Sequence, residues 1–461
     1  MESPDRGGSH CRSPLVLPTR PVMPRYFLKT YGCQMNMAES QRLRCLLASA
    51  GWEEAAVPGE ADVVVVNTCS VRQHAEDRAM GFLRSCVRKR GRTPFLCLYG
   101  CMAGVHGASL FDQFPFLSGV CAPAQWARLP RLLDEMASGR KVLALGDSDN
   151  RFSPLPCANG SVSVSVPITS GCSNRCAYCI VPAARGPLRS RPMREILSEI
   201  EHLSANGAKE AVLLGQNVNE YGGGGRAFVS LLEAVHEIPG ILRIRFLTSH
   251  PKDMPPELLH AWRRLPKLVR HLHLPLQSAS DRVLAHMRRG YTRQQYLDIV
   301  REFRALVPDG MLTSDLITGF PGETEGDFEE TRQMVADGMF DDLFVFAYSP
   351  RPGTAAAQLP DDVPPEEKRR RHRELLCLQD SISLRKNRAT VGSRRIVLVQ
   401  RTAVTMPGHL KAHGLDGRTV LVRGDAQLIG KLVAVRITGA GRHYLEGEPQ
   451  THSLCGSVTP Q

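Results

Sequence analysis

Apolar residues in the first third of the chain occur in short runs that are separated by longer amphipathic stretches. Short apolar runs predict strands, whereas apolar residues at helical spacing predict helices. The expected strands are 26–31, 62–66 and 95–99, and the expected helices are 38–50, 72–90 and 125–136. This alternation predicts a doubly wound α/β domain over residues 25–140, built on a parallel sheet.

The same alternation resumes after a segment rich in Gly, Asp, Ser, Asn and Pro, residues 141–161, which we interpret as a linker. The expected strands are 162–168, 211–214, 242–247, 271–274, 312–317 and 342–347. Strands that alternate with helices in this number predict a partial βα barrel over residues 162–388, with a full barrel as the alternative. Functional side chains of such barrels lie at the C-terminal ends of the strands.

The last part of the chain changes to short alternating strands with Gly-rich turns, at 395–400, 419–423 and 431–438. This pattern predicts a small β-barrel over residues 390–452. Residues 394–446 contain nine Lys and Arg but three Asp and Glu. This excess of positive charge favours binding to a nucleic acid backbone over a purely structural cap. The basic run 368–373 lies on an expected helix, and we expect it to be a solvated face.

Composition limits the class of protein. A chain of 461 residues with 42% hydrophobic and 23% charged residues is typical of a soluble protein of several domains. Residues 1–24 lack the apolar core of a secretory signal, so we expect a disordered tail there, with a transit peptide as the weaker alternative. A second tail is expected at 453–461. No apolar stretch is long enough to span a bilayer. Fourteen cysteines without a disulfide-dense module predict a cytoplasmic protein, and a net charge of +12 favours a polyanionic partner.

The most informative residues are Cys172, Cys176 and Cys179, whose C-x-x-x-C-x-x-C spacing places three thiols on one loop. Iron–sulfur clusters normally have four cysteine ligands, so a trio predicts a cluster with one iron left for an outside ligand, S-adenosylmethionine. A structural zinc site is the alternative, but it requires a fourth ligand and the next candidate is the distant His202.

The expected topology predicts a second group of three cysteines. Cys33, Cys69 and Cys101 each come just after one of the first three expected strands. Because the carboxyl ends of parallel strands meet at one edge of a sheet, we expect the three thiols to lie together. They form a second candidate three-thiolate site, with isolated buried thiols as the alternative.

Longer motifs surround both trios. They are 30–36, 67–69, 100–102, 172–182, 214–219, 248–253, 273–278, 319–324 and 348–351. Through these motifs the chain resembles, over nearly its whole length, the radical S-adenosylmethionine methylthiotransferases, most closely the branch that makes 2-methylthio-isopentenyladenosine in tRNA. Two positions depart from the family pattern: Leu188 stands where an acidic residue is usual, and Ala279 replaces a usual glycine.

The resemblance implies two 4Fe-4S clusters, with Cys172, Cys176 and Cys179 holding the radical-generating one and the other trio an auxiliary one. It implies that S-adenosylmethionine is cleaved to a deoxyadenosyl radical, that sulfur is inserted at C-2 of the adenosine, and that a second S-adenosylmethionine methylates this sulfur. The motif matches and strand-end positions assign Tyr178, Gln216, Asn217 and Asp315 to positioning S-adenosylmethionine, with rim packing as the alternative role. The C-terminal barrel resembles the RNA-binding TRAM module.

The implied partners are the anticodon stem-loop of a tRNA and a reductant such as a flavodoxin or ferredoxin, whereas the sulfur donor is not indicated. No membrane partner is expected. Two alternatives within the class are a methylthiotransferase acting on threonylcarbamoyladenosine in tRNA and one acting on an aspartate of a ribosomal protein. An alternative from another class is a non-catalytic iron–sulfur protein that binds RNA or senses redox state.

Overall fold

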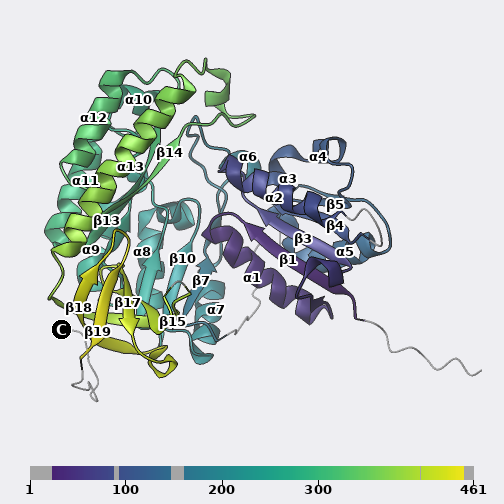
Figure 1. Ribbon diagram of the computed structural model, residues 1–461, viewed down its shortest axis with the longest axis horizontal. Coiled ribbons are helices and arrows are strands. Elements are labelled where there is room, and N and C mark those ends of the chain that lie inside the picture. The colour runs from purple at the N-terminus through teal and green to yellow at the C-terminus, as the bar shows by residue number, and fades with distance from the viewer. Residues whose placement is uncertain (1–22, 88–92, 147–159, 405, 451–461) are drawn as a thin grey trace, which may run out of the picture.

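The computed structural model describes residues 23–87, 93–146, 160–404 and 406–450 (Figure 1). Most of the expected tails and of the expected linker therefore lies outside the described residues. An N-terminal α/β part lies beside a larger part of strands and helices, and a small barrel lies below the latter. No helix in these ranges is both long and apolar enough to cross a membrane.

The N-terminal part is a doubly wound parallel sheet, as predicted. Its strands lie in the order β2-β1-β3-β4-β5-β6. They are β1 (Arg25–Tyr31), β2 (Glu53–Glu54), β3 (Val63–Thr68), β4 (Phe95–Gly100), β5 (Gly119–Cys121) and β6 (Val142–Ala144). The central strand β3 is buried on both faces, which is why its sequence is a continuous run of valines. Strand β6 extends the sheet into the segment expected to be linker.

Helices cover both faces of this sheet. They are α1 (Gln34–Ser49), α2 (Gln73–Cys86), α3 (Cys101–His106), α4 (Ser109–Gln113) and α5 (Leu129–Ala137). Alternate valines of β3 point to opposite sides: Val63 and Val65 pack in the core under α1 and α5, and Val64 and Val66 in the core under α2 and α3. Helix α1 begins directly after Cys33, four residues before the predicted start.

The central part is a partial βα barrel, which confirms the first of the two predicted forms. Its six parallel strands form two sheets, ordered β11-β10-β7 and β12-β13-β14, and one bridge joins Ile244 to Leu268. The strands are β7 (Ser163–Pro167), β10 (Glu210–Leu214), β11 (Arg243–Phe246), β12 (His271–His273), β13 (Met311–Thr318) and β14 (Asp342–Ala347). The short pair β8 (Thr169–Ser170) and β9 (Arg189–Ser190) follows β7.

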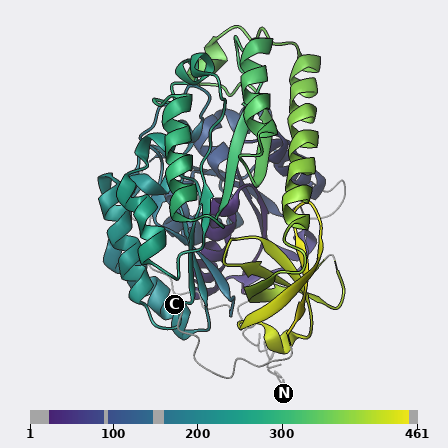
Figure 2. The same ribbon diagram turned by 90° about the vertical axis from the view of Figure 1, so that its left-hand side faces the viewer.

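The longer helices of this part pack around the outside of the strands (Figure 2). They are α7 (Met193–Ala205), α8 (Gly225–Glu237), α9 (Pro256–Arg264), α11 (Arg293–Leu306), α12 (Glu325–Ala336) and α13 (Pro365–Arg388). Two short helices, α6 (Val181–Arg185) and α10 (Asp281–His286), follow strand ends. One large hydrophobic core joins the strands to these helices.

The C-terminal part is a closed five-stranded barrel, as predicted, in the order β15-β16-β17-β19-β18. Its strands are β15 (Arg394–Thr402), β16 (His409–Gly414), β17 (Thr419–Arg423), β18 (Leu432–Ala440) and β19 (Leu445–Pro449). The barrel packs against the N-terminal ends of the central strands. Arg243 donates to the carbonyl oxygens of His413 and Gly414, and Gln400 Nε2 donates to Glu210 Oε2 at 2.7 Å.

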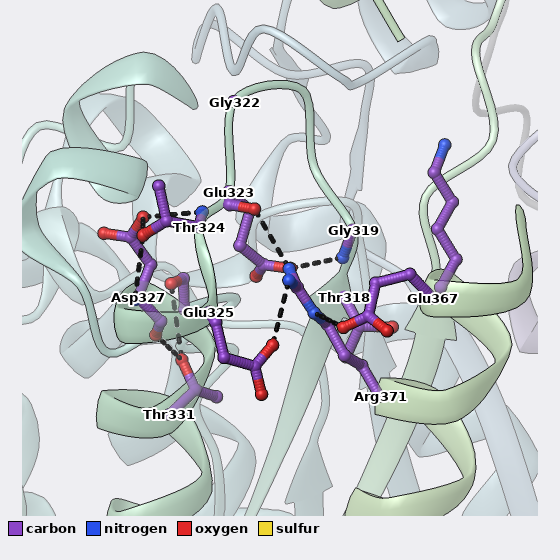
Figure 3. A network of polar contacts seen from close by, with 12 residues as sticks. Thr318, Gly319, Gly322, Glu323, Thr324, Glu325, Asp327, Thr331, Glu367 and Arg371 are labelled. Atoms are coloured by element: carbon purple, nitrogen blue, oxygen red, sulfur yellow. Dashed lines mark hydrogen bonds and ion pairs between the residues drawn. The ribbon is translucent and has the colours of Figure 1, made fainter. Parts of the chain in front are cut away.

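The basic run 368–373 lies on α13, as predicted, but the expectation of a solvated face is wrong for Lys368 and Arg371, which are buried. Figure 3 shows Arg371 beneath the loop that follows β13. Its guanidinium donates to Glu323 Oε2 at 2.8 Å and to Glu367 Oε1 at 2.8 Å. Glu323 also accepts from Gly319 N at 2.5 Å. This network holds the loop after β13 on α13 and so fixes one side of the barrel rim.

Candidate functional site

The structure brings Cys33, Cys69 and Cys101 together, because β1, β3 and β4 are adjacent parallel strands that end side by side. Hydrogen bonding with Cys69 lowers the pKa of Cys33 to about 6. The same kind of contact with Cys69, aided by the charge of Arg185, lowers the pKa of Cys101 against the effect of burial. The three cysteines therefore lie side by side at one edge of the sheet.

Polar residues beside Cys33 stabilise this edge of the sheet. Asn36 Nδ2 donates to Asn67 Oδ1 at 2.9 Å, and Asn67 Nδ2 donates to Ser40 Oγ at 3.0 Å. A Cβ atom at Gly32 would lie 2.5 Å from Asn36 Oδ1, so only glycine lets this pair form. The buried amides thus tie α1 to β3 and fix the position of Cys33.

Arg185 connects this trio to the central part of the chain. It ends α6, the helix that follows the Cys172 loop, and its side chain is 3% exposed. Its Nε donates to Cys101 Sγ at 3.2 Å, and its two terminal nitrogens donate to the carboxylate of Glu39 at 2.5 and 3.0 Å. The guanidinium therefore provides positive charge directly beside a sulfur of the trio.

Cys172, Cys176 and Cys179 lie on the loop between β8 and α6. Cys176 Sγ accepts from Arg289 Nη1 at 3.3 Å and lies 3.8 Å from His250 Nε2. Burial raises the pKa of Cys172 to about 11 and that of Cys179 to about 12. A metal bound at the trio would remove this penalty, because a coordinating thiol is deprotonated by the ion.

The donor set fits two clusters of the predicted kind. All six cysteines are free thiols. Among the residues that the structure describes, no group of three or more Cys, His, Asp or Glu side chains is arranged for a single metal ion. An iron–sulfur cluster instead takes one cysteine on each iron, so three thiolates leave one iron for another ligand.

A cavity of about 410 Å³ is lined by residues from both parts of the chain that carry the trios. Its lining includes Tyr178 and Cys179 of one loop and residues 71–74, which directly follow Cys69. Strands β13 and β14 contribute Asp315 and Ile317 and residues 345–347. This volume is in the range of pockets that enclose small ligands. A molecule in this cavity would have both cysteine loops beside it.

The four residues predicted to position S-adenosylmethionine fall into two groups. Tyr178 and Asp315 line the cavity, and the Tyr178 hydroxyl accepts from Arg289 Nη1 at 3.3 Å. Gln216 and Asn217 instead brace the loops beside the trio. Gln216 Oε1 accepts from Gly171 N at 2.7 Å, and Asn217 Nδ2 donates to Asp253 Oδ2 at 2.7 Å.

Gln277, which belongs to the 273–278 motif, also lines the cavity with φ at +74°, and its backbone bonds to Asp315 and Ile317 on β13. Two other site residues are not indicated by the sequence pattern. Arg185 and Arg289 reach the sulfurs from 84 and 113 residues away in the chain, and no local spacing points to either contact.

Three known families match successive parts of the chain. Residues 25–122 match the Uncharacterized protein family UPF0004, residues 166–335 the Radical SAM superfamily and residues 388–449 the TRAM domain. A radical S-adenosylmethionine methyltransferase, TsrM, from Kitasatospora setae has a similar fold, with a TM-score of 0.53 at 14% identity over 73% of this chain and 74% of that one. The fold and the thiol loop thus define a radical S-adenosylmethionine enzyme.

Similar proteins of known name identify the family of this chain. The tRNA-2-methylthio-N(6)-dimethylallyladenosine synthase of Chromobacterium violaceum is 43% identical over 93% of this chain and 99% of its own length. Those of Neisseria gonorrhoeae and Moorella thermoacetica are 41% and 42% identical, over 92% and 91% of this chain and 99% and 97% of their own lengths. The chain belongs to the family of the tRNA-2-methylthio-N(6)-dimethylallyladenosine synthases. Its cofactors are S-adenosylmethionine and 4Fe-4S clusters, as the sequence predicts.

Proposed function

We propose that the protein converts N6-isopentenyladenosine beside the anticodon of a tRNA to its 2-methylthio derivative. The family supports the reaction, and one observation supports its location: a single cavity borders both Cys179 and the loop that follows Cys69. Such a cavity lets one bound nucleoside approach both cysteine sites. The two clusters and S-adenosylmethionine, when bound, supply the radical chemistry by which an unactivated aromatic C–H bond is replaced with a C–S bond.

Residues of the chain bind the cofactors and position them. Cys172, Cys176 and Cys179 hold the cluster that binds S-adenosylmethionine, and Cys33, Cys69 and Cys101 hold the auxiliary cluster. Tyr178 and Asp315 position S-adenosylmethionine within the cavity. Gln216 and Asn217 act indirectly, because their side chains fix the loop that carries the first trio.

Arginines beside the sulfurs support the same roles. Arg289 donates to Cys176, and Arg185 donates to Cys101, so each trio has one guanidinium at a ligand sulfur. Hydrogen bonds to cluster sulfurs raise the reduction potential of a cluster. Both arginines are buried, so bulk water does not screen their charge.

The substrate implies further partners. The C-terminal barrel would hold the RNA backbone with its basic strands, which predicts tRNA affinity that falls steeply with salt. The target base lies in a single-stranded loop, so little energy is needed to turn it into the cavity. A flavodoxin or ferredoxin as the electron source, and a cytoplasmic location, are part of this proposal.

The test uses a bacterial strain that lacks its own synthase for this modification. We expect the wild-type chain to restore 2-methylthio-isopentenyladenosine in nucleoside mass spectrometry, and Cys33→Ser or Cys176→Ser to leave isopentenyladenosine unmodified. Cys377→Ser is the matched control, because Cys377 is a free and exposed thiol on α13.

The same experiment separates the alternatives. Restoration of a methylthiolated threonylcarbamoyl species, with isopentenyladenosine unchanged, would overturn the proposed substrate. A reconstituted protein that binds tRNA but forms no deoxyadenosine from S-adenosylmethionine under reducing conditions would instead indicate a non-catalytic iron–sulfur protein.

A further inference from the structure

Phe344 is a large apolar side chain that is exposed on a strand whose flanking residues are buried. It lies in the middle of β14 and is 50% exposed, whereas Leu343 and Val345 on either side of it are buried. Leu343 and Val345 belong to the core between strands and helices, so Phe344 lies on the opposite face of β14, away from those helices. Core packing therefore does not explain a phenylalanine at this position.

The register of the sheet places Phe344 next to the cavity. Phe344 pairs with Asp315 of the neighbouring strand, and paired residues of parallel strands point to the same face. Asp315 lines the cavity, and so does Phe346, the next residue of β14 on that face. The Phe346 ring is itself covered by the Arg72 guanidinium at 5.0 Å. Phe344 is thus the next aromatic ring outside the cavity, on the side of the C-terminal barrel.

Cationic and polar side chains continue from Phe344 to that barrel. The His273 ring meets the Phe344 ring edge-on with centroids 6.1 Å apart. Arg245 of β11 lies farther along, with Nη1 3.0 Å from His413 Nδ1 and with a buried Nε that has no hydrogen-bond partner. Lys411 of β16 lies two residues before His413, on the same face of the strand, and pairs with Arg401 of β15. The positive charges of Arg245, Lys411 and Arg401 therefore lie close together.

This arrangement matches the chemistry of single-stranded nucleic acid. Proteins bind single strands by stacking bases on aromatic rings and by placing positive charge along the backbone. The row has an exposed ring at the cavity end and cations at the barrel end. A folded protein partner would instead need an extended apolar patch, whereas Phe344 has the His273 ring and the paired Asp315 beside it, and Phe346 lies within the cavity.

We propose that Phe344, His273, Arg245 and Lys411 form a stacking face for a nucleotide adjacent to the target adenosine. The base of that nucleotide stacks on Phe344, and phosphates of the same strand lie against Arg245 and Lys411. This inference rests on the proposed function, because it takes the anticodon loop as the RNA. It adds a residue that holds the loop open while the neighbouring base is in the cavity.

The experiment measures binding of an anticodon stem-loop that carries isopentenyladenosine to the cluster-loaded protein, by fluorescence anisotropy. Stacking on one aromatic residue corresponds to roughly a 5- to 140-fold change in affinity on truncation to alanine. We expect Phe344→Ala to weaken binding within this range and Phe344→Trp to retain wild-type affinity. Val57→Ala is the control, because Val57 is similarly exposed but lies in the N-terminal part, away from the cavity.

A probe of stacking separates this role from a structural one. With 2-aminopurine on either side of the target adenosine, we expect the fluorescence of one probe at saturating protein to differ between wild type and Phe344→Ala. We also expect Lys411→Gln to reduce the slope of log affinity against log salt by about one. Wild-type affinity in Phe344→Ala, or equal losses in Phe344→Ala and Phe344→Trp with unchanged thermal unfolding, would overturn the proposal.

The outcome is independent of the proposed chemistry. If the wild type binds the stem-loop but makes no methylthio product, the proposed function fails and the stacking face is still judged by binding. If the wild type makes the product and Phe344→Ala binds equally well, the stacking face alone is refuted.

Discussion

Loss of the Arg185 side chain should destabilise the contact between the N-terminal and central parts of the chain. Its guanidinium pairs with both oxygens of Glu39 and donates to Cys101 Sγ, and the side chains of Arg185 and Glu39 are 3% and 17% exposed. Replacement by methionine keeps much of the volume and removes every donor. The Glu39 carboxylate is then left in a buried site without its partner, and Cys101 loses its charged neighbour.

The expected cost follows from this geometry. Removing one partner of a buried ion pair costs about 3–5 kcal/mol. Whole domains are stable by only about 5–15 kcal/mol, so this is a large share. For a domain of this size, we expect the unfolding midpoint of Arg185→Met to fall by on the order of 10 °C. The double variant Arg185→Met, Glu39→Leu should recover part of the loss, because neither charge remains.

Thermal unfolding of the metal-free protein tests this expectation, with iron content after reconstitution as a second measurement. Arg226→Met is the matched control, because Arg226 is 91% exposed and lies 3.8 Å from Glu257. Surface pairs of this kind contribute about 0–1 kcal/mol. Two outcomes would show that the buried pair does not stabilise this interface. One is an unfolding midpoint of Arg185→Met within about 2 °C of wild type, and the other is a double variant that loses more stability than the two single variants together.

Three further outcomes are expected. Burial alone would raise the pKa of Asp327, but hydrogen bonds from Arg282, Ser280 and Thr324 hold it well below its usual value. The ionised carboxylate therefore stabilises the fold above about pH 4 and loses this effect at lower pH. In urea unfolding, Asp327→Asn should lose more unfolding free energy relative to wild type at pH 7 than at pH 3. Equal losses at the two pH values would contradict this expectation. Anaerobic reconstitution should give about eight irons per wild-type chain and about four in either triple Cys→Ala variant, whereas zinc in the wild type would exclude the cluster assignment. Affinity for tRNA should fall at least tenfold between 50 and 200 mM salt, measured by filter binding, and a flat response would exclude backbone contacts.

Sequence periodicity predicted the strands that are rich in β-branched and other apolar residues. Strands β1, β3 and β4 were expected within two residues of their observed ends, because each carries a continuous apolar run. Strand β16 was not expected, since its alternation of His, Lys and His with Leu410 and Ala412 gives a weak apolar signal. It becomes a strand through pairing with β15 and β17, which the sequence alone does not reveal.

The positions of site residues could be predicted where they follow from the order of the strands. Contacts made by long side chains could not be predicted. Strand ends in a parallel sheet meet at one edge, so the convergence of Cys33, Cys69 and Cys101 could be inferred from their positions. The contact of Arg185 with Cys101 depends on how α6 packs against α3, between two parts of the chain. Arg371 illustrates the same limit: in sequence it belongs to a basic run, and only the fold places it under the Glu323 loop.

The attachment of the C-terminal barrel at the foot of the central strands has a consequence for substrate choice. Arg243 and Glu210 fix the barrel at one end of the sheet, and the cavity lies at the other end. Strands β10 and β11, five and four residues long, lie between these two ends and set a fixed separation. Under the proposed function, the backbone held at the barrel and the base in the cavity must match this separation. The enzyme would thereby select its target by measuring the shape of the loop.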